Sequence, residues 1–149
     1  MELETALGQA YLFSGVEKRH LRKLARKMRN VNYQTGDEIM RAGGPAWHGG
    51  LGSMGVVLKG SLQVCHPDGA VFAHIRPGEV FGEMALIDDQ PRSATLIAEE
   101  PTEVALLSAV EFRDELKDNQ AFTLNLVRIL AQRLREARAE QREGGARTA

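Results

Sequence analysis

The segment FGEMALIDDQPRSAT at residues 81–95 constrains this chain more than any other feature of its sequence. Gly82 lets the backbone approach a ligand closely, because glycine has no Cβ and tolerates unusual dihedral angles. Residues 83–87 are expected to form one short helical turn, whose first amide groups are unpaired and attract an anion. Arg92 adds a permanent charge and a planar guanidinium that can grip two phosphate oxygens. The segment therefore predicts a small phosphate pocket.

Glu83 is the unexpected member of this segment, because a carboxylate beside a phosphate is repulsive. Its presence is explained if it accepts a hydrogen bond from a sugar hydroxyl, as an acidic residue does for ribose in dinucleotide-binding folds. The alternative is a structural one, a buried ion pair between Arg92 and Glu83 at the corner of a β-sandwich. The combination of groups favours the first interpretation, a site for one phosphate and one ribose.

This arrangement resembles the phosphate-binding cassette of the cyclic nucleotide-binding domain family. The matching positions are Phe81, Gly82, Glu83, Ala85, Leu86, Pro91, Arg92, Ala94 and Thr95. The resemblance extends from about Leu12 to about Glu140. It implies a mainly β fold, a β-sandwich or jelly-roll barrel of about eight strands, with an N-terminal helix and two C-terminal helices. Residues 1–149 would form a single cyclic nucleotide-binding domain.

The resemblance also implies which residues bind the ligand. The expected set is Phe81, Gly82, Glu83, Met84, Ala85, Arg92, Ser93 and Ala94. Glu83 would hold the ribose 2′-hydroxyl, while Arg92 and the amides near Ala85 and Ser93 would hold the cyclic phosphate. Leu86 and Ile87 would couple this segment to the C-terminal helices. No catalytic residue, metal or other cofactor is implied.

The choice between cAMP and cGMP is not decided by the sequence, although cAMP is favoured. Ser93 follows the cassette arginine, where a hydroxyl can help to recognise guanine, but serine also occurs there in bacterial cAMP receptors. In those receptors part of the base contact comes from hydroxyl side chains on the long helix. The corresponding positions here are Ala137 and Arg138, which lack those hydroxyls. We therefore expect loose base specificity.

The rest of the chain has the periodicities that such a fold requires. An apolar stripe at Leu21, Leu24, Ala25 and Met28 predicts a helix over residues 15–29, with Ser14 and Glu17 as a capping box. Short apolar segments separated by glycine and proline then predict strands in a barrel spanning residues 31–107. The predicted strands are residues 31–34, 38–41, 54–59, 61–65, 71–75, 94–98 and 103–107.

Helical periodicity returns in the C-terminal segment, residues 108–142. Ser108 is expected to cap a helix that ends near Lys117, and a long helix then runs from Asn119 or Gln120 to about Arg142. One apolar edge of that helix (Phe122, Leu126, Ile129) is expected to pack on the barrel. A second edge, Val127, Leu130, Leu134 and Ala137, has heptad spacing and predicts a homodimer through residues 122–142.

Composition excludes several classes of protein. A net charge of −1 gives no general attraction to nucleic acid or anionic membranes, and a single cysteine, Cys65, excludes an internal disulfide. The four histidines have no metal-type spacing, and no catalytic motif is present, so we expect a protein that is not an enzyme. No apolar run could span a membrane and the acidic N-terminus is no signal peptide, which predicts a cytoplasmic protein.

Three interpretations remain open for the biological role. The favoured one is a stand-alone receptor that signals to an unidentified downstream protein. Few residues follow Arg142, too few for a DNA-reading helix pair, so direct DNA binding is not expected. The alternatives are a regulatory fragment of a transcription regulator, kinase, transporter or channel, and a degenerate dimerisation domain. The basic residues of 17–29 are interpreted as a solvated helix face. Residues 42–53, rich in glycine, depart from the family pattern, as does Gly55, where an aromatic residue is usual.

Overall fold

Two antiparallel sheets of four strands form a barrel in the computed structural model, which describes residues 3–44, 53–88 and 91–148. The strand order is β1-β8-β3-β6 in one sheet and β2-β7-β4-β5 in the other. The strands are β1 (Arg29–Tyr33), β2 (Glu38–Met40), β3 (Ser53–Lys59), β4 (Leu62–Cys65), β5 (Val71–Ile75), β6 (Val80–Phe81), β7 (Thr95–Ala98) and β8 (Thr102–Ser108). The predicted mainly β fold with about eight strands is confirmed.

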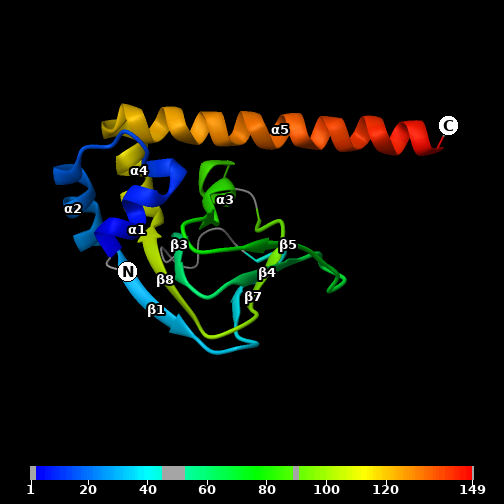
Figure 1. Cartoon of the computed structure of the whole chain (residues 1–149), viewed down its shortest axis with the longest axis horizontal. Helices are drawn as coiled ribbons and strands as arrows, with labels where there is room; N and C mark the ends of the chain where they lie inside the picture. The colour runs from blue at the N-terminus through cyan, green and yellow to red at the C-terminus, as the bar shows by residue number, and fades with distance from the viewer. Residues whose placement is uncertain (1–2, 45–52, 89–90, 149) are drawn as a thin grey trace.

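Helices cover one end and one side of this barrel (Figure 1). They are α1 (Leu3–Gln9), the 3-10 turn η1 (Tyr11–Phe13), α2 (Lys18–Lys27), α3 (Glu83–Asp88), α4 (Ala109–Asp118) and α5 (Gln120–Thr148). The helices α1, α2 and α4 gather at one end, and α3 lies between the strands and α5. The long helix α5 continues past the barrel, so its C-terminal part projects from the molecule.

The structure corrects several predicted boundaries. The helix predicted over residues 15–29 is shorter in the structure, where α2 spans Lys18–Lys27. Its N-cap residue is Glu17, whose side chain makes no capping hydrogen bond. Ser14 instead ends η1, where its amide donates to the Tyr11 carbonyl oxygen. The sequence did not indicate α1, η1 or the two-residue strand β6. The long helix also extends beyond Arg142, to Thr148.

Ser108 caps α4 as expected, since its hydroxyl accepts a hydrogen bond from the Glu111 amide over 3.2 Å. The predicted inner edge of α5 is also confirmed. Phe122 and Leu126 are buried, and Ile129 packs against the same core.

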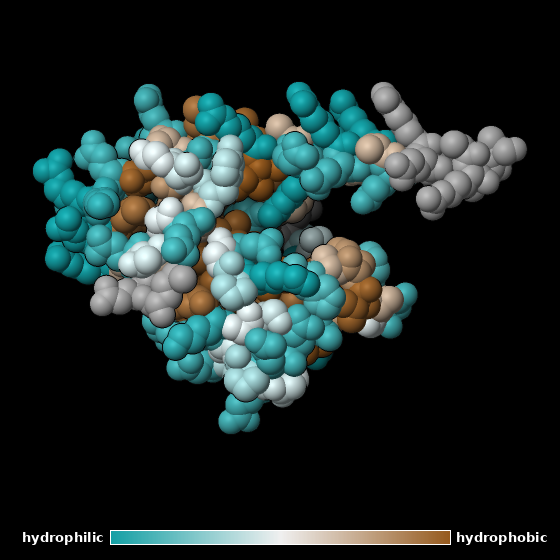
Figure 2. Space-filling model, in the orientation of Figure 1, coloured by the Kyte–Doolittle hydropathy of each residue, from teal (hydrophilic) through white to brown (hydrophobic). Residues whose placement is uncertain are grey.

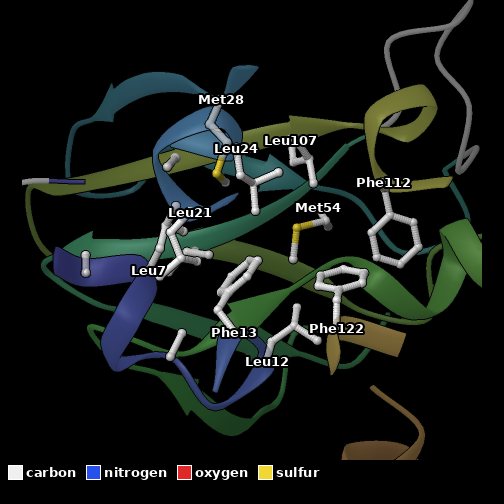
Figure 3. Close-up of a cluster of buried hydrophobic side chains, with 14 of the residues drawn as sticks. Leu7, Leu12, Phe13, Leu21, Leu24, Met28, Met54, Leu107, Phe112 and Phe122 are labelled. Carbon is white, nitrogen blue, oxygen red and sulfur yellow. The ribbon is translucent and has the colours of Figure 1, made fainter. Parts of the chain in front are cut away.

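The apolar interior forms two clusters. The larger joins the helices to β3 and β8, and Phe13, Phe112 and Phe122 meet at its centre (Figure 3). The ring centroids of Phe122 lie 5.7 Å from those of both Phe13 and Phe112. The smaller cluster lies between the two sheets and includes Phe81 and Leu96. Leu86 of α3 belongs to the larger cluster, so the cassette shares a core with the helices.

The departure at Gly55 has a steric explanation. A Cβ at this position would lie 2.2 Å from Cζ of Phe81, so the Phe81 ring occupies the space that a side chain there would need. Most of the glycine-rich segment 42–53 lies outside the described residues. Among the helices of the described part of the chain, none is long and apolar enough to cross a membrane.

Candidate functional site

The site begins at the turn between β6 and α3, where the backbone of Gly82 has a positive φ of 81°. This left-handed conformation strains any residue that carries a Cβ. A Cβ at Gly82 would also lie 2.7 Å from Cε of Met40 and 3.0 Å from Nη1 of Arg92. Glycine is therefore required both by the backbone and by the close approach of the arginine.

Arg92 is held in place by backbone carbonyl groups. Its Nη1 donates to the Gly82 oxygen over 2.7 Å, and its Nη2 donates to the Ser53 oxygen over 2.9 Å. Burial lowers the pKa of Arg92 from its usual value, and the negative charge of Glu83 opposes this shift. The guanidinium remains charged, because an arginine pKa lies far above neutrality. The result is a positioned, half-buried cation at the edge of α3.

Glu83 opens α3 and is only 2% exposed, yet it does not pair with Arg92 as the structural alternative required. Its Oε1 accepts instead from Nη1 of Arg133 on α5, which is 50 residues away in sequence. The Arg133 side chain is 43% exposed, so it can move away without breaking the core. The carboxylate expected to bind ribose is thus engaged by an arginine from the long helix.

All eight predicted ligand residues line one cavity of about 620 Å³. Further walls come from β5 (Phe72, His74) and from α5 (Arg133, Glu136). Figure 2 shows the corresponding hollow between the projecting part of α5 and the barrel. A smaller cavity of about 460 Å³ contains none of the cassette residues 81–95, so the larger one is the candidate site.

The positions expected to contact the base are not brought to this cavity. Ala137 and Arg138 are exposed on α5, and neither is among the residues described as lining the cavity. Arg133 and Glu136 line it instead, together with Phe72. The sequence did not indicate these three, because they come from elements far from the cassette and belong to no motif. Their recognition requires the topology that brings β5 and α5 to α3.

In the described part of the chain, three histidines contact other side chains. His20 bonds to Glu115 over 2.8 Å, His74 bonds to Glu99 over 3.0 Å, and His66 stacks on Phe72. Within the described ranges, no group of three or more His, Cys, Asp or Glu side chains could hold a metal ion.

These groups together can bind one anion and one polyol. Arg92 and the N-terminal amides of α3 favour a phosphate, while the buried Glu83 carboxylate accepts hydroxyl hydrogen bonds. The sequence pattern of the family described as "Cyclic nucleotide-binding domain" matches residues 30–119, more than half of the chain. The chain belongs to the cyclic nucleotide-binding domain family.

Individual proteins of known identity agree with this assignment. Acetyltransferase Pat of Mycolicibacterium smegmatis is 32% identical over 125 residues, which cover 82% of this chain and 36% of that protein. A CRP-like cAMP-activated global transcriptional regulator of Mycobacterium tuberculosis is 26% identical over 139 residues, covering 89% of this chain and 59% of the regulator.

The crystal structure of the Thermus thermophilus catabolite activator protein is also similar, with a TM-score of 0.77 and 30% identity. The match covers 89% of this cyclic nucleotide-binding chain and 62% of the Thermus chain. The chain therefore spans only 36% and 59% of the two sequence relatives and less than two thirds of the structural one.

Proposed function

We propose that this protein is a sensor that binds a cyclic nucleoside monophosphate without converting it, with cAMP favoured over cGMP. The observation that carries the proposal is the convergence of Gly82, Glu83 and Arg92 on one cavity of about 620 Å³. Arg92 binds the cyclic phosphate and Glu83 the ribose 2′-hydroxyl. The positioned guanidinium speaks against a degenerate domain, because two carbonyl groups hold it beside the space that a phosphate would occupy.

Titration calorimetry with cAMP and cGMP tests the proposal on the parent chain and on Arg92→Ala. Removing one side of a desolvated charge pair costs about 2–5 kcal/mol, which corresponds to roughly 30-fold to several-thousand-fold weaker binding. Arg92→Lys should also weaken binding, because an ammonium cannot reproduce the two-pronged contact. Binding of Arg92→Ala within about threefold of the parent would mean that the phosphate lies elsewhere. Turnover to a linear nucleotide would contradict the sensor role.

The relay of binding is proposed to run through Glu83 and α5. A ribose hydroxyl that bonds to Glu83 shares the carboxylate with Arg133 or replaces it there, and this is the route by which ligand binding would change the one described ion pair between α3 and the projecting part of α5. Leu86 supports this route, since it is buried in the core shared with α5, whereas Ile87 is exposed. A ligand that favours one arrangement of α5 a hundredfold supplies about 2.7 kcal/mol.

The receiver of this signal is proposed to be a second copy of the chain, with an unidentified downstream protein beyond it. Val127 and Leu134 are 56% and 54% exposed on α5, and they form part of the heptad edge predicted to dimerise. Such side chains become buried when two α5 helices pack together.

A second role is a regulatory segment of a larger polypeptide. The low coverage of the relatives favours this alternative, because residues 1–149 match only 36% of the acetyltransferase and 59% of the regulator. An immunoblot of the cells that produce the protein distinguishes the two roles. A band near 16.4 kDa supports the stand-alone receptor, and a much larger band supports the regulatory segment.

A further inference from the structure

The contacts proposed so far leave the base of a bound nucleotide without an assigned partner. With Arg92 assigned to the phosphate and Glu83 to the ribose, the base remains to be placed against the other walls of the cavity, which include residues of β5 and α5. The α5 positions expected to meet it, Ala137 and Arg138, are not among the described lining residues. Within a single chain, the base contact is therefore sought among the other side chains that line the cavity.

Phe72 is the exposed aromatic side chain among the described walls of the cavity. It lies in β5 and is 52% exposed, whereas Phe81, the other phenylalanine of the lining, is only 2% exposed. Leaving an aromatic ring half in water forgoes the burial that usually stabilises such a side chain. Figure 2 shows hydrophobic side chains over the β4–β5 hairpin, at the edge of the hollow beneath α5. The exposed ring thus borders the unassigned part of the site.

The ring of Phe72 also contacts a neighbouring aromatic side chain. His66 stacks on Phe72 with ring centroids 4.0 Å apart and an interplanar angle of 22°. The backbone of His66 closes the hairpin, because its amide donates to the Ala70 oxygen and its oxygen accepts from the Gly69 amide, both over 2.9 Å. One face of Phe72 is therefore supported by a side chain on a tight turn, and the ring stays half-exposed.

We propose that Phe72, supported by His66, is the stacking platform for the purine base of the bound nucleotide. The proposal rests on the proposed function, because it concerns the same cavity. Every base presents a π-face, so an aromatic ring binds bases by stacking without reading their hydrogen-bonding edges. A platform of this kind favours the larger purines over pyrimidines and distinguishes adenine from guanine poorly. It provides a physical basis for loose discrimination between cAMP and cGMP.

Titration calorimetry with cAMP, cGMP and cCMP tests the assignment in the parent chain, Phe72→Leu and Phe72→Trp. Loss of a base–aromatic stack weakens binding by about 5- to 140-fold. Phe72→Leu should show such a loss for both purine nucleotides and a smaller loss for cCMP, so the preference for purines shrinks. Phe72→Trp should bind cAMP within about threefold of the parent, because it restores a π-face. The matched control is Val71→Ala, which changes a neighbour that is 45% exposed and does not line the described cavity.

The outcomes separate this inference from the proposed function. If the parent and Val71→Ala bind cAMP, Arg92→Ala does not, and Phe72→Leu binds within twofold of the parent, the stacking role is wrong while the sensor role stands. If the parent binds none of the three nucleotides, both proposals are wrong. Circular dichroism of each variant confirms folding, which a half-exposed position should not disturb.

Discussion

Residues 120–141 of α5 divide into an inner and an outer half that differ in how they are attached to the molecule. In the inner half, residues 120–130, Phe122 and Leu126 are buried, and Nδ2 of Asn125 donates to the carbonyl oxygens of Leu12 and Ser14 over 3.1 and 2.7 Å. In the outer half, residues 131–141, every residue is exposed. The ion pair described between this outer half and the rest of the molecule joins Arg133 to Glu83 of α3. One face of the inner half belongs to the core, whereas the outer half is held by Glu83, the proposed ribose acceptor.

This difference indicates where a ligand can act. Many apolar contacts and the two hydrogen bonds donated by Asn125 hold the inner half, so displacing it would cost far more than moving the outer half. The outer half depends on an ion pair whose arginine is 43% exposed, so a ligand group can replace that arginine at the carboxylate. The carboxylate of that pair is also the proposed ribose acceptor. Binding and movement are therefore expected to share Glu83.

Phe122→Ala should have the largest effect and should break the inner half. The side chain is fully buried between Phe13 and Phe112, and truncating such a phenylalanine costs about 3–5 kcal/mol of unfolding free energy. Urea denaturation followed by circular dichroism measures this loss. Leu124→Ala is the matched control in the same half, since Leu124 is 48% exposed and should change stability by only about 0.5 kcal/mol. Equal effects of the two variants would contradict the assignment of this half to the core.

Arg133→Ala should have an intermediate effect, confined to the outer half. It leaves the Glu83 carboxylate buried without its cation, at a cost of about 1–2 kcal/mol, below the range for fully buried pairs because Arg133 is 43% exposed. Hydrogen exchange should become faster over residues 131–141 and stay unchanged over residues 120–130. Saturating cAMP should alter exchange in the outer half of the parent and have a smaller effect in the variant. Unchanged exchange in the ligand-bound parent would show that α5 does not carry the signal.

The difference between the two halves of α5 also shows which features a sequence can predict. The cassette residues from Phe81 to Ala94 could be predicted because they form one contiguous segment whose residue types match a family motif. The inner edge of α5 was identifiable from its periodicity, because burial on one face of a helix leaves a regular apolar pattern. Strand positions followed from apolar segments between turns. In each case the information is local.

The groups that contact Arg92 and Glu83 from distant parts of the chain were not predictable, because their positions depend on the long-range fold. Arg92 bonds to the backbone oxygen of Ser53, 39 residues away, and a carbonyl group has no signature in a sequence. Arg133 is one of several arginines on α5, and only the position of the helix over α3 singles it out. Ser14 and Glu17 matched a capping pattern, yet the preceding turn η1 places Ser14 elsewhere. Long-range geometry decides these contacts.

Leu134→Ala should have the smallest effect on the fold, and it tests the predicted dimer edge in the outer half of α5 most directly. Leu134 is 54% exposed in the outer half, so its loss should change the unfolding free energy of the single chain by about 0.5 kcal/mol or less. If two α5 helices pack through this edge, the same change removes a buried leucine from each subunit and weakens the dimer.

Sedimentation equilibrium should then show a dissociation constant raised at least about tenfold for Leu134→Ala and left unchanged for Leu124→Ala, whose side chain lies outside the predicted heptad edge. The stability of a dimer also depends on protein concentration, so denaturation midpoints of the parent should rise with concentration and those of Leu134→Ala should rise less. A parent that stays monomeric at all concentrations, with and without cAMP, would contradict the homodimer. The outer half of α5 would then have to signal through a different protein.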